Sequence, residues 1–385
     1  MKTVAVLGGG PAGAMAARAL AVAGVRTVLF DEKLAWEKPC GGGVTFKAYQ
    51  QYPFLLETGR HRSVAGTSLH TAGAGAARLT LGKPMLIFSR RELNQILLDR
   101  AAGVGADLRR ARVMEMGRAN GRWELRTSAG SFGCDFVIVA TGARNALAGV
   151  GTAFRAADCM PALGYFVPGA QRDIDIEFFA GFEGYAWVFP RTDHMSVGIC
   201  GKGEPASAMR SRLERYMDAR GIARADSSFY GHMLPSLDAG SWRGNRLAGD
   251  GWLAAGDAGG LVDPVTGEGI YYAMRSGELA GELVAAERVG EYAATVSREF
   301  GDDLAYASTL ARRLFLGRYL YGSNTARLIQ FLRRSRRLQG IAQELFAGTM
   351  PYHELRKQIK ESLHLTLTEI GVNVFLRRMT GEGVE

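Results

Sequence analysis

The chain has 385 residues, of which 47% are hydrophobic and 22% are charged, and its formal net charge is +9. This is the composition of a globular protein with two or three packed units, and it excludes a disordered or fibrous chain. The 51 glycines, about 13% against a norm of roughly 7%, follow no Gly-X-Y period and predict tight turns and close approaches to a ligand. The four cysteines form no CxxC pair, which argues against a disulfide scaffold and a structural metal and fits a cytoplasmic protein. No apolar run reaches the roughly 18 residues that a membrane-spanning helix needs.

The first thirty residues predict a strand, a glycine turn, a helix and a second strand. Residues 3–7 are a continuous apolar run, which is typical of a parallel strand buried on both faces. The turn that follows has the spacing G-x-G-x-x-G. We expect four of its residues to contact a dinucleotide, namely Gly8, Gly10, Ala12 and Gly13. Its first glycine permits the turn, its second lets the backbone approach a pyrophosphate, and its third allows close helix packing. The start of the helix then offers N–H groups to the phosphates.

An acidic residue should follow the second strand to bind the ribose hydroxyls of a dinucleotide. Asp31 and Glu32 both stand there; strand alternation does not choose between them, and the spacing slightly favours Asp31. The motif, its strand context and the acid together predict a dinucleotide site rather than an alanine-rich helix start without a ligand. Because the chain has one such fingerprint, we expect one tightly held dinucleotide.

Residues 160–200 change character to short strands separated by Pro, Gly and Asp, which predicts an antiparallel sheet in a second domain. A buried-strand pattern returns at residues 251–256, and the chain beyond about residue 300 is helical in pattern. We therefore expect an α/β fold with a discontinuous Rossmann-type FAD-binding domain, an antiparallel substrate domain and a C-terminal helical region. Their expected ranges are 1–58, 85–158 and 246–300; 59–84 and 159–245; and 301–385.

A second cluster of glycines and acids narrows the choice of dinucleotide. Residues 255–259, Ala-Gly-Asp-Ala-Gly, resemble the second flavin signature of the p-hydroxybenzoate-hydroxylase-like flavoproteins. That resemblance implies that Gly256 and Asp257 contact FAD, the aspartate through the ribitol chain. It also implies that a helix begins near Gly267, Gly269 and Ile270, with its amides facing the flavin pyrimidine ring.

Two further motifs are similar to those of the geranylgeranyl reductase family. Residues 38–43, Lys-Pro-Cys-Gly-Gly-Gly, resemble the family's PCGG loop, and residues 185–190 resemble its Y-x-W-x-F-P motif. The resemblance covers about residues 1–300 and implies that the loop lies beside the isoalloxazine and that the second motif lines the substrate cavity. The residues carried over to the cofactor are Gly42, Gly43, Arg90 and Val113. Residues 140–143, Ala-Thr-Gly-Ala, depart from the D-G pair of many of these flavoproteins, which leaves open how a nicotinamide reaches the flavin.

The residues of these motifs suit that chemistry by themselves. Three glycines after Cys40 allow its loop to approach a flat ring closely. Cys40 is the candidate catalytic residue, either as a proton donor or as a small polarizable side chain. Tyr185, Trp187 and Phe189 alternate and therefore share one face of a strand. Such an aromatic face suits a polyisoprenoid substrate, and ordinary core packing is the alternative.

The resulting hypothesis is an FAD-dependent reductase that hydrogenates double bonds of a geranylgeranyl-type chain on a diphosphate or lipid. NADPH or another reductant would supply the electrons. The alternative is a flavin-dependent monooxygenase or halogenase acting on an apolar or aromatic substrate. A halogenase would need a W-x-W-x-I-P strand and a cavity lysine, whereas this chain has Tyr185 first and Lys83 as its suggestive lysine. A flavin-binding sensor or membrane-associated partner protein is a third, non-enzymatic class.

The positive charge is concentrated near the C-terminus. Residues 304–343 contain eight arginines and no acidic residue, with leucines and aromatics interleaved, which predicts one or two basic amphipathic helices. Packing on the main body, contact with an anionic membrane surface at the inner face, and contact with an anionic substrate are the interpretations. No nucleic-acid module accompanies the arginines, so no nucleic-acid partner is expected.

Overall fold

The chain passes repeatedly between two units, each assembled from three separate segments of sequence. The computed structural model describes residues 2–147, 149–319, 322–359 and 361. Unit 1 comprises Met1–Lys38, Ser89–Met160 and Met233–Ser308, and unit 2 comprises Pro39–Phe88, Pro161–His232 and Thr309–Glu385. Of the helical region expected at the C-terminus, residues 362–385 lie outside the described residues.

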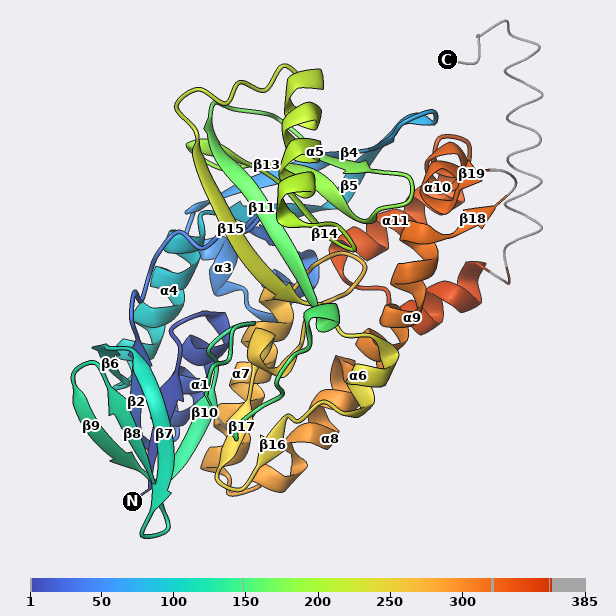
Figure 1. The fold of residues 1–385 in the computed structure, drawn as a ribbon. Coiled ribbons are helices and arrows are strands. Elements are labelled where there is room, and N and C mark those ends of the chain that lie inside the picture. Colours follow the sequence, from blue (N-terminus) through green and yellow to red (C-terminus); the bar gives the residue numbers. More distant parts are fainter. Residues whose placement is uncertain (1, 148, 320–321, 360, 362–385) are drawn as a thin grey trace, which may run out of the picture. The chain divides into compact units, whose positions relative to one another are not determined.

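Unit 1 is built on a six-stranded sheet of order β16-β17-β10-β1-β2-β6, in which all neighbours are parallel except β16 and β17. The apolar run near the N-terminus forms β1, whose five residues are all buried. The expected α/β fold with a Rossmann-type sheet is confirmed (Figure 1). The strands are β1 (Thr3–Leu7), β2 (Arg26–Asp31), β6 (Asp107–Arg110), β10 (Phe136–Val139), β16 (Ala248–Gly249) and β17 (Trp252–Ala254).

Two helices of unit 1 pack backbone against backbone through glycines. Helix α1 (Pro11–Val22) contacts both α4 (Arg90–Ala102) and α7 (Ile270–Ala285). A Cβ at Gly277 would lie 2.0 Å from the carbonyl oxygen of Ala12, and one at Gly281 would lie 2.6 Å from that of Ala16. Because no side chain fits between them, α7 presses directly on α1 and its N-terminus is placed close to the glycine turn.

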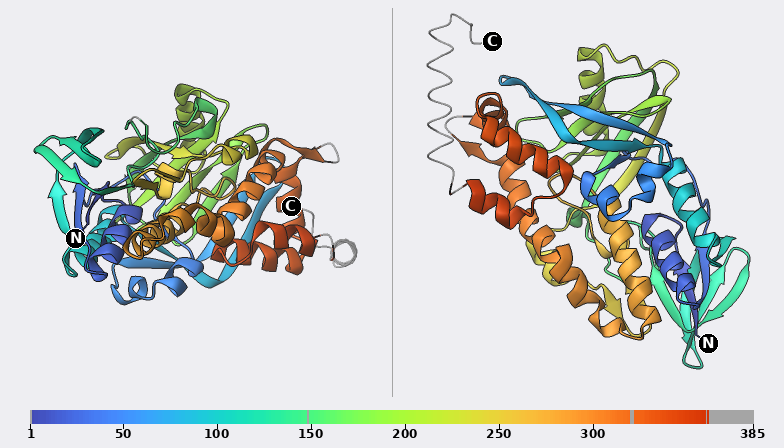
Figure 2. Two further views of the ribbon diagram at one scale, coloured as in Figure 1. Left: turned by 90° about the horizontal axis from the view of Figure 1, so that it is seen from below. Right: turned by 180° about the vertical axis from the view of Figure 1, so that it is seen from behind.

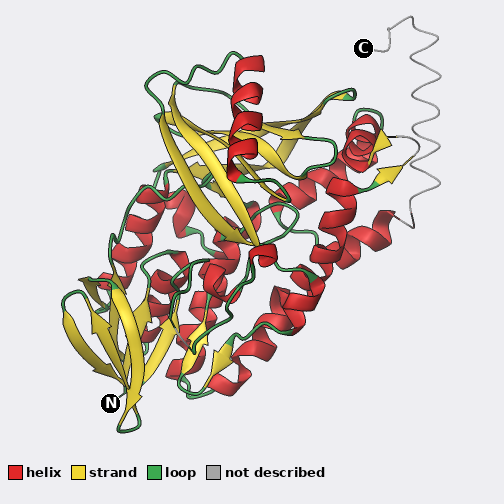
Figure 3. Cartoon of the chain, in the orientation of Figure 1, coloured by secondary structure: helices red, strands yellow, loops and turns green. Residues whose placement is uncertain are grey.

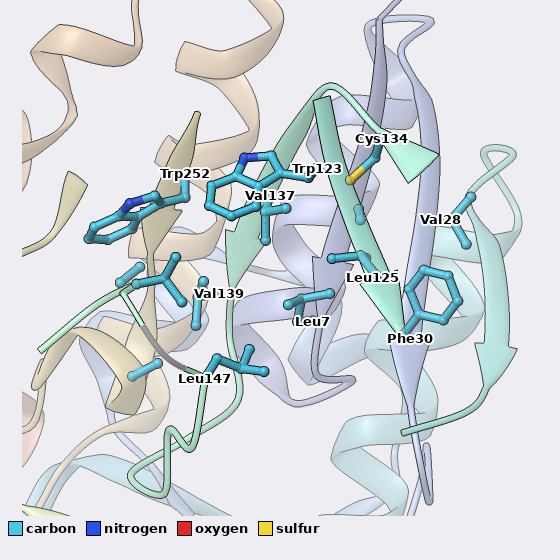
Figure 4. Packing of buried hydrophobic residues seen from close by; sticks show 14 of the residues in the cluster. Leu7, Val28, Phe30, Trp123, Leu125, Cys134, Val137, Val139, Leu147 and Trp252 are labelled. Atoms are coloured by element: carbon cyan, nitrogen blue, oxygen red, sulfur yellow. The ribbon is translucent and has the colours of Figure 1, made fainter. Parts of the chain in front are cut away.

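A small antiparallel sheet covers one side of the large sheet in unit 1. It contains β7 (Val113–Ala119), β8 (Arg122–Thr127) and β9 (Gly130–Cys134), drawn as the yellow three-stranded sheet in Figure 3. Trp123 and Leu125 of β8 pack in one buried cluster with Leu7, Val139 and Trp252 of the large sheet (Figure 4). This cluster is the hydrophobic core on that side of unit 1.

The remaining elements of unit 1 are η1 (Ala156–Asp158), α6 (Ala239–Arg243), η2 (Gly256–Gly259), η3 (Val289–Glu291), α8 (Tyr292–Val296), the π-helical turn η4 (Ser297–Gly301) and the start of α9 (Asp302–Leu316).

Unit 2 is built on an eight-stranded sheet of order β15-β11-β14-β13-β12-β4-β5-β3. From β11 to β3 its pairs are antiparallel apart from β12 with β4, so the antiparallel sheet expected from residues 160–200 is present. The strands are β3 (Gly43–Val44), β4 (His61–Thr71), β5 (Gly75–Phe88), β11 (Cys159–Pro168), β12 (Ile174–Phe178), β13 (Glu183–Pro190), β14 (His194–Lys202) and β15 (Ser228–Pro235). Short helices α2 (Phe46–Gln51) and α3 (Phe54–Glu57) follow β3.

Helices cover both faces of this sheet because side chains alternate along each strand. Ala186 and Val188 of β13 face a cluster that contains α5 (Ala206–Ala219). Tyr185 and Phe189 face the other cluster, which contains α10 (Asn324–Leu332) and α11 (Arg336–Ala347). Figure 2 shows these two C-terminal helices beside β4 and β5. A short hairpin of β18 (Arg318–Tyr319) and β19 (Gly322–Ser323) precedes α10, and among the described residues no helix is long and apolar enough to cross a membrane.

Candidate active site

The three glycines of the N-terminal turn, Gly8, Gly10 and Gly13, differ in the space that surrounds them. Gly8 has φ +110°, and a Cβ there would lie 2.2 Å from the carbonyl oxygen of Ala140. A Cβ at Gly13 would lie 1.8 Å from the carbonyl oxygen of Gly8. Gly10 has φ −73°, and a Cβ there would meet no described atom within 4 Å. The protein's own packing therefore requires Gly8 and Gly13, whereas the open space beside Gly10 is what the close approach of a ligand needs.

The start of α1 is open to an anion. Gly10 is its N-cap and no side chain caps it, and Pro11 has no N–H. The amides of the following turn are therefore the available donors, at the positive end of the helix dipole. Ala12 is 5% exposed, and its Cβ lies 2.9 Å from the position of a Cβ on Gly256. Ala12 therefore joins the glycine turn to the second flavin signature.

The Asp31 carboxylate lies against the same turn. One of its oxygens accepts from the N–H of Gly9 at 2.6 Å, and the other accepts from the N–H groups of Lys33 and Leu34 at 2.7 and 2.6 Å. A carboxylate has about four acceptor positions, so these bonds leave room for a ribose hydroxyl. Glu32 is exposed. The geometry supports the spacing argument in favour of Asp31.

Arg90 is a buried cation at the first position of α4. It is 3% exposed, its Nη2 donates to Asn94 Oδ1 at 3.4 Å, and its buried Nε has no hydrogen-bond partner among the described residues. Glu37 is close but binds backbone instead, accepting from the N–H groups of Arg90 and Arg91 at 2.9 and 3.3 Å. A buried guanidinium with an unsatisfied donor is costly unless a ligand pairs with it. Arg90 therefore fits contact with a polar, anionic group such as FAD.

The second flavin signature lies at the start of α7. Gly256 and Gly267 have φ of +61° and +72°, in the left-handed region that favours glycine. Asp257 forms an ion pair with Lys38, with 3.1 Å between Lys38 Nζ and Asp257 Oδ2, and both side chains are largely buried. Gly269 is the N-cap of α7 without a side-chain cap, and Ile270 follows it in the core. Unlike at the start of α1, an amide of the first turn is already engaged here, because the N–H of Tyr271 donates to the Glu268 carboxylate at 2.8 Å.

Val113 is the last of the residues that the family resemblance assigns to the cofactor, and its surroundings differ from those of the polar groups described above. It begins β7 and packs, partly buried, against the hydrophobic cluster beneath the small sheet. Taken together, the open space at Gly10, the unsatisfied Arg90 and the uncapped start of α1 fit an FAD molecule held by unit 1. The individual contacts of these residues with FAD remain predictions.

In unit 2 the structure brings the two reductase-like motifs into contact. A Cβ at Gly41 would lie 3.0 Å from the ring of Phe189, and one at Gly43 would lie 3.0 Å from the same ring and 2.7 Å from Met85 Sδ. Gly42 has φ +83°, and a Cβ there would lie 2.1 Å from the carbonyl oxygen of Phe88. The glycines after Cys40 are therefore needed to lay this loop on the aromatic strand.

The three aromatic residues of β13 share a face, as expected, but their surroundings differ. Tyr185 and Phe189 are half-buried, and Tyr185 is stacked near Phe315 of α9 with ring centroids 6.5 Å apart. Trp187 is 6% exposed and its indole N–H donates to Ser196 Oγ at 3.4 Å. Tyr185 and Phe189 are thus partly buried against the cluster that contains α10 and α11, whereas Trp187 is hydrogen-bonded to a buried hydroxyl group.

Comparison with known proteins agrees with this geometry. A family model described as pyridine nucleotide-disulphide oxidoreductase matches residues 2–160. Digeranylgeranylglycerophospholipid reductase 2 of Methanothermobacter thermautotrophicus is 32% identical over 319 residues, which cover 74% of this chain and 78% of that protein. The chain belongs to the geranylgeranyl reductase family. It is an FAD-dependent oxidoreductase, and its expected cofactor is confirmed.

Other relatives and structural neighbours of this oxidoreductase also cover most of the chain. The chloroplastic geranylgeranyl diphosphate reductase of Oryza sativa subsp. japonica is 29% identical over 327 residues, 74% of this chain and 66% of that protein. The crystal structure of a geranylgeranyl bacteriochlorophyll reductase-like protein from Thermoplasma acidophilum has a TM-score of 0.75 at 20% identity, covering 94% of this chain and 99% of that chain. The flavin-dependent brominase Bmp2 shares the fold, with a TM-score of 0.69 at 16% identity and coverage of 94% and 99%.

Sequence reasoning missed an ionisable residue of the reductase inside the second flavin signature. Glu268 stands between Gly267 and Gly269, and its Oε1 accepts from the N–H of Tyr271 at 2.8 Å. Its pKa is raised to about 7, chiefly by burial and also by the negative charge of Asp263, while the hydrogen bond from Tyr271 and the cation of Arg90 oppose the shift. The signal was its position between two glycines that were themselves assigned to the flavin.

Sequence reasoning also missed three polar residues next to the Cys40 loop of the reductase. Arg191 follows the aromatic motif directly, Ser196 lies on β14 and Tyr230 lies on β15. They are 1%, 0% and 7% exposed. Arg191 and Ser196 donate to the Cys40 carbonyl, and Tyr230 Oη lies 2.9 Å from Ser196 Oγ. These contacts depend on strand pairing, which no local pattern reveals.

Proposed function

We propose that this reductase hydrogenates carbon–carbon double bonds of a prenyl chain carried on a lipid or a diphosphate. The observation that carries the proposal is the packing of the Cys40 loop on Phe189, because this contact joins the two motifs that distinguish the family. The names of two relatives support it, since one reduces a digeranylgeranylglycerophospholipid and the other a geranylgeranyl diphosphate. When bound, reduced FAD supplies the hydride for such a reaction.

Each unit has its own task in this proposal. In unit 1, the amides at the start of α1, with Asp31, Arg90 and Asp257, bind the cofactor. In unit 2, the half-buried faces of Tyr185 and Phe189 contact the apolar chain. Addition of a hydride to one alkene carbon requires a proton on the other, and we infer that the Cys40 thiol donates it. The Cys40 sulfur accepts a hydrogen bond from the N–H of Gly42 at 3.3 Å, which orients the thiol.

The decisive assay uses dithionite-reduced, FAD-loaded protein with geranylgeranyl diphosphate and with a digeranylgeranylglycerophospholipid. Mass spectrometry should show a gain of two hydrogens for each double bond reduced. Replacing dithionite by NADPH under anaerobic conditions tests the electron donor, because bleaching of the flavin absorbance reports its reduction. Lack of hydrogenation with both substrates, despite complete flavin reduction, would refute the proposed reaction.

Within the part of the chain that the structure describes, we find no contact that favours the halogenase alternative. Lys83 donates to both carboxylate oxygens of Glu344 at 3.2 Å, and its ammonium lies 5.0 Å from the ring centroid of Phe46. It is therefore engaged in an ion pair instead of being available in a cavity. Oxygen consumption coupled to hydroxylated or halogenated product would restore this alternative.

We also propose that the C-terminal region of the reductase contacts an anionic membrane surface. Around the β18–β19 hairpin, Leu316 and Tyr319 are 37% and 56% exposed, and Arg312, Arg313 and Arg318 are exposed beside them. Apolar and basic side chains in one short segment suit the boundary of an anionic bilayer. Arg327 and Arg333 differ, because their guanidinium groups donate to the carbonyl oxygens of Tyr319 and Ala74.

A further inference from the structure

The backbone carbonyl of Cys40 receives two side-chain donors from the middle of the three segments that form unit 2. Arg191 Nη2 donates to this oxygen at 2.5 Å and Ser196 Oγ donates to it at 2.9 Å. Both donors are buried, at 1% and 0% exposure. A loop carbonyl is ordinarily satisfied by water or by one neighbouring amide, so two buried side chains on one oxygen form a specific clamp.

The hydrogen bonds around Ser196 have a single consistent arrangement of protons. The indole N–H of Trp187 can only donate, and it donates to Ser196 Oγ at 3.4 Å. The one hydroxyl proton of Ser196 goes to the Cys40 carbonyl. Tyr230 Oη, 2.9 Å from Ser196 Oγ, must therefore be the donor in that pair. Burial raises the pKa of Tyr230, so its hydroxyl stays protonated and able to donate.

The Arg191 guanidinium is buried beside the Cys40 loop. A neutral side chain could also donate to a carbonyl oxygen, but a cation forms the stronger, charge-assisted hydrogen bond. The Cζ of Arg191 lies 5.1 Å from the centroid of the Phe166 ring. Its Nε would lie 3.6 Å from a Cβ on Gly42, so the guanidinium also lies against the glycines of the loop. These contacts suit a residue that fixes the orientation of the loop.

We propose that Arg191 and Ser196 are positioning residues that hold the peptide of Cys40 and thereby keep its thiol in one orientation. Trp187 and Tyr230 fix the Ser196 hydroxyl for this task. A role in turnover rests on the proposed function, in which Cys40 donates a proton. The clamp itself does not rest on it and is testable without substrate.

The test measures the alkylation of Cys40 by iodoacetamide in the FAD-loaded protein, followed by mass spectrometry of the Cys40 peptide. Arg191→Met should raise the rate about tenfold, because the Cys40 carbonyl loses its charged hydrogen-bond donor. Ser196→Ala should raise it less, and Arg191→Lys should partly restore the wild-type rate. Arg212→Met is the matched control, because that guanidinium lies over Phe179 and Phe182 in the same unit.

Turnover is measured on the same proteins, together with FAD content and thermal midpoint. A positioning role predicts a lower kcat in Arg191→Met, with FAD content equal to that of Arg212→Met. If Arg191→Met does not fold, Ser196→Ala decides by itself. An unchanged or lower alkylation rate in every folded clamp variant would overturn the clamp, whatever happens to turnover. If instead the clamp variants raise alkylation but Cys40→Ser leaves turnover unchanged, the clamp stands and the catalytic role of Cys40 fails.

Discussion

The ring of Phe189 lies directly against the backbone of Gly41, 3.0 Å from the position that a Cβ on this glycine would take. We expect Gly41→Ala to lower turnover of a prenyl substrate, because the new methyl group displaces either the loop or the ring. In a Phe189→Ala background the same change should have a smaller effect, since the space is then open. A double-mutant cycle on kcat/KM measures this coupling, and additive effects would contradict the contact.

The glycine turn offers a contrast between ligand binding and folding. Gly10→Ala should lower FAD content while leaving the thermal midpoint of the FAD-free protein nearly unchanged, because the methyl group meets no protein atom. Gly13→Ala should destabilise the protein by about 1–3 kcal/mol or more, since its Cβ overlaps the carbonyl oxygen of Gly8. Flavin absorbance and thermal unfolding distinguish the two; equal unfolding effects would refute the distinction.

Arg90 should lower the stability of the FAD-free protein and strengthen the binding of FAD. Replacement by Met removes a buried charge whose Nε is unsatisfied, so Arg90→Met should leave the stability of the FAD-free protein unchanged or higher. The same variant should bind FAD at least about tenfold more weakly, because a charged hydrogen bond is lost. Titration with FAD, monitored by flavin fluorescence, measures the affinity. Undiminished affinity would show that this guanidinium does not meet the cofactor.

The raised pKa of Glu268 predicts how the stability of the folded protein depends on pH. Its pKa is raised from 4.5 to about 7, so between these values the folded protein binds a proton that the unfolded chain has released. Its contribution is therefore present at low pH and is lost as pH rises toward about 7, by at most about 3 kcal/mol. Glu268→Gln should remove this fall. Unfolding by urea at about pH 5 and about pH 8 checks it, and parallel changes in the two proteins would contradict the shift.

The exposed arginines beside the β18–β19 hairpin should make the protein bind anionic vesicles in a salt-dependent way. More protein should co-sediment with anionic vesicles than with neutral ones, and the amount should fall when salt is added, because exposed charges are screened. Replacing the three arginines beside the hairpin by Gln should weaken it, at about 1 kcal/mol for each residue near the surface. The three are Arg312, Arg313 and Arg318.

A control with the same change in net charge separates this site from a general charge effect. It replaces three arginines exposed elsewhere, namely Arg91, Arg112 and Arg172. The control protein should bind the vesicles as the wild type does. Equal losses in both triple variants would assign the attraction to net charge alone.

The local patterns of the sequence predicted the features that depend on backbone geometry. The G-x-G-x-x-G spacing, the acid after β2 and the glycines around Asp257 each describe a turn or a helix start, which a few consecutive residues determine. The same is true of the alternating Tyr185 and Phe189, because strand periodicity places them on one face. The α/β fold, the FAD cofactor and the enzyme family were therefore predictable from residues close together in the chain.

The tertiary structure decided which of these residues meet and which polar groups are left without water. Arg191 and Ser196 reach the Cys40 carbonyl across 151 and 156 residues, through the pairing of β13 with β14 and the path of the glycine loop. The unsatisfied Arg90 and the raised pKa of Glu268 likewise depend on burial by distant segments. Strand register and desolvation are sums over contacts made by the whole unit, so no local pattern contains them.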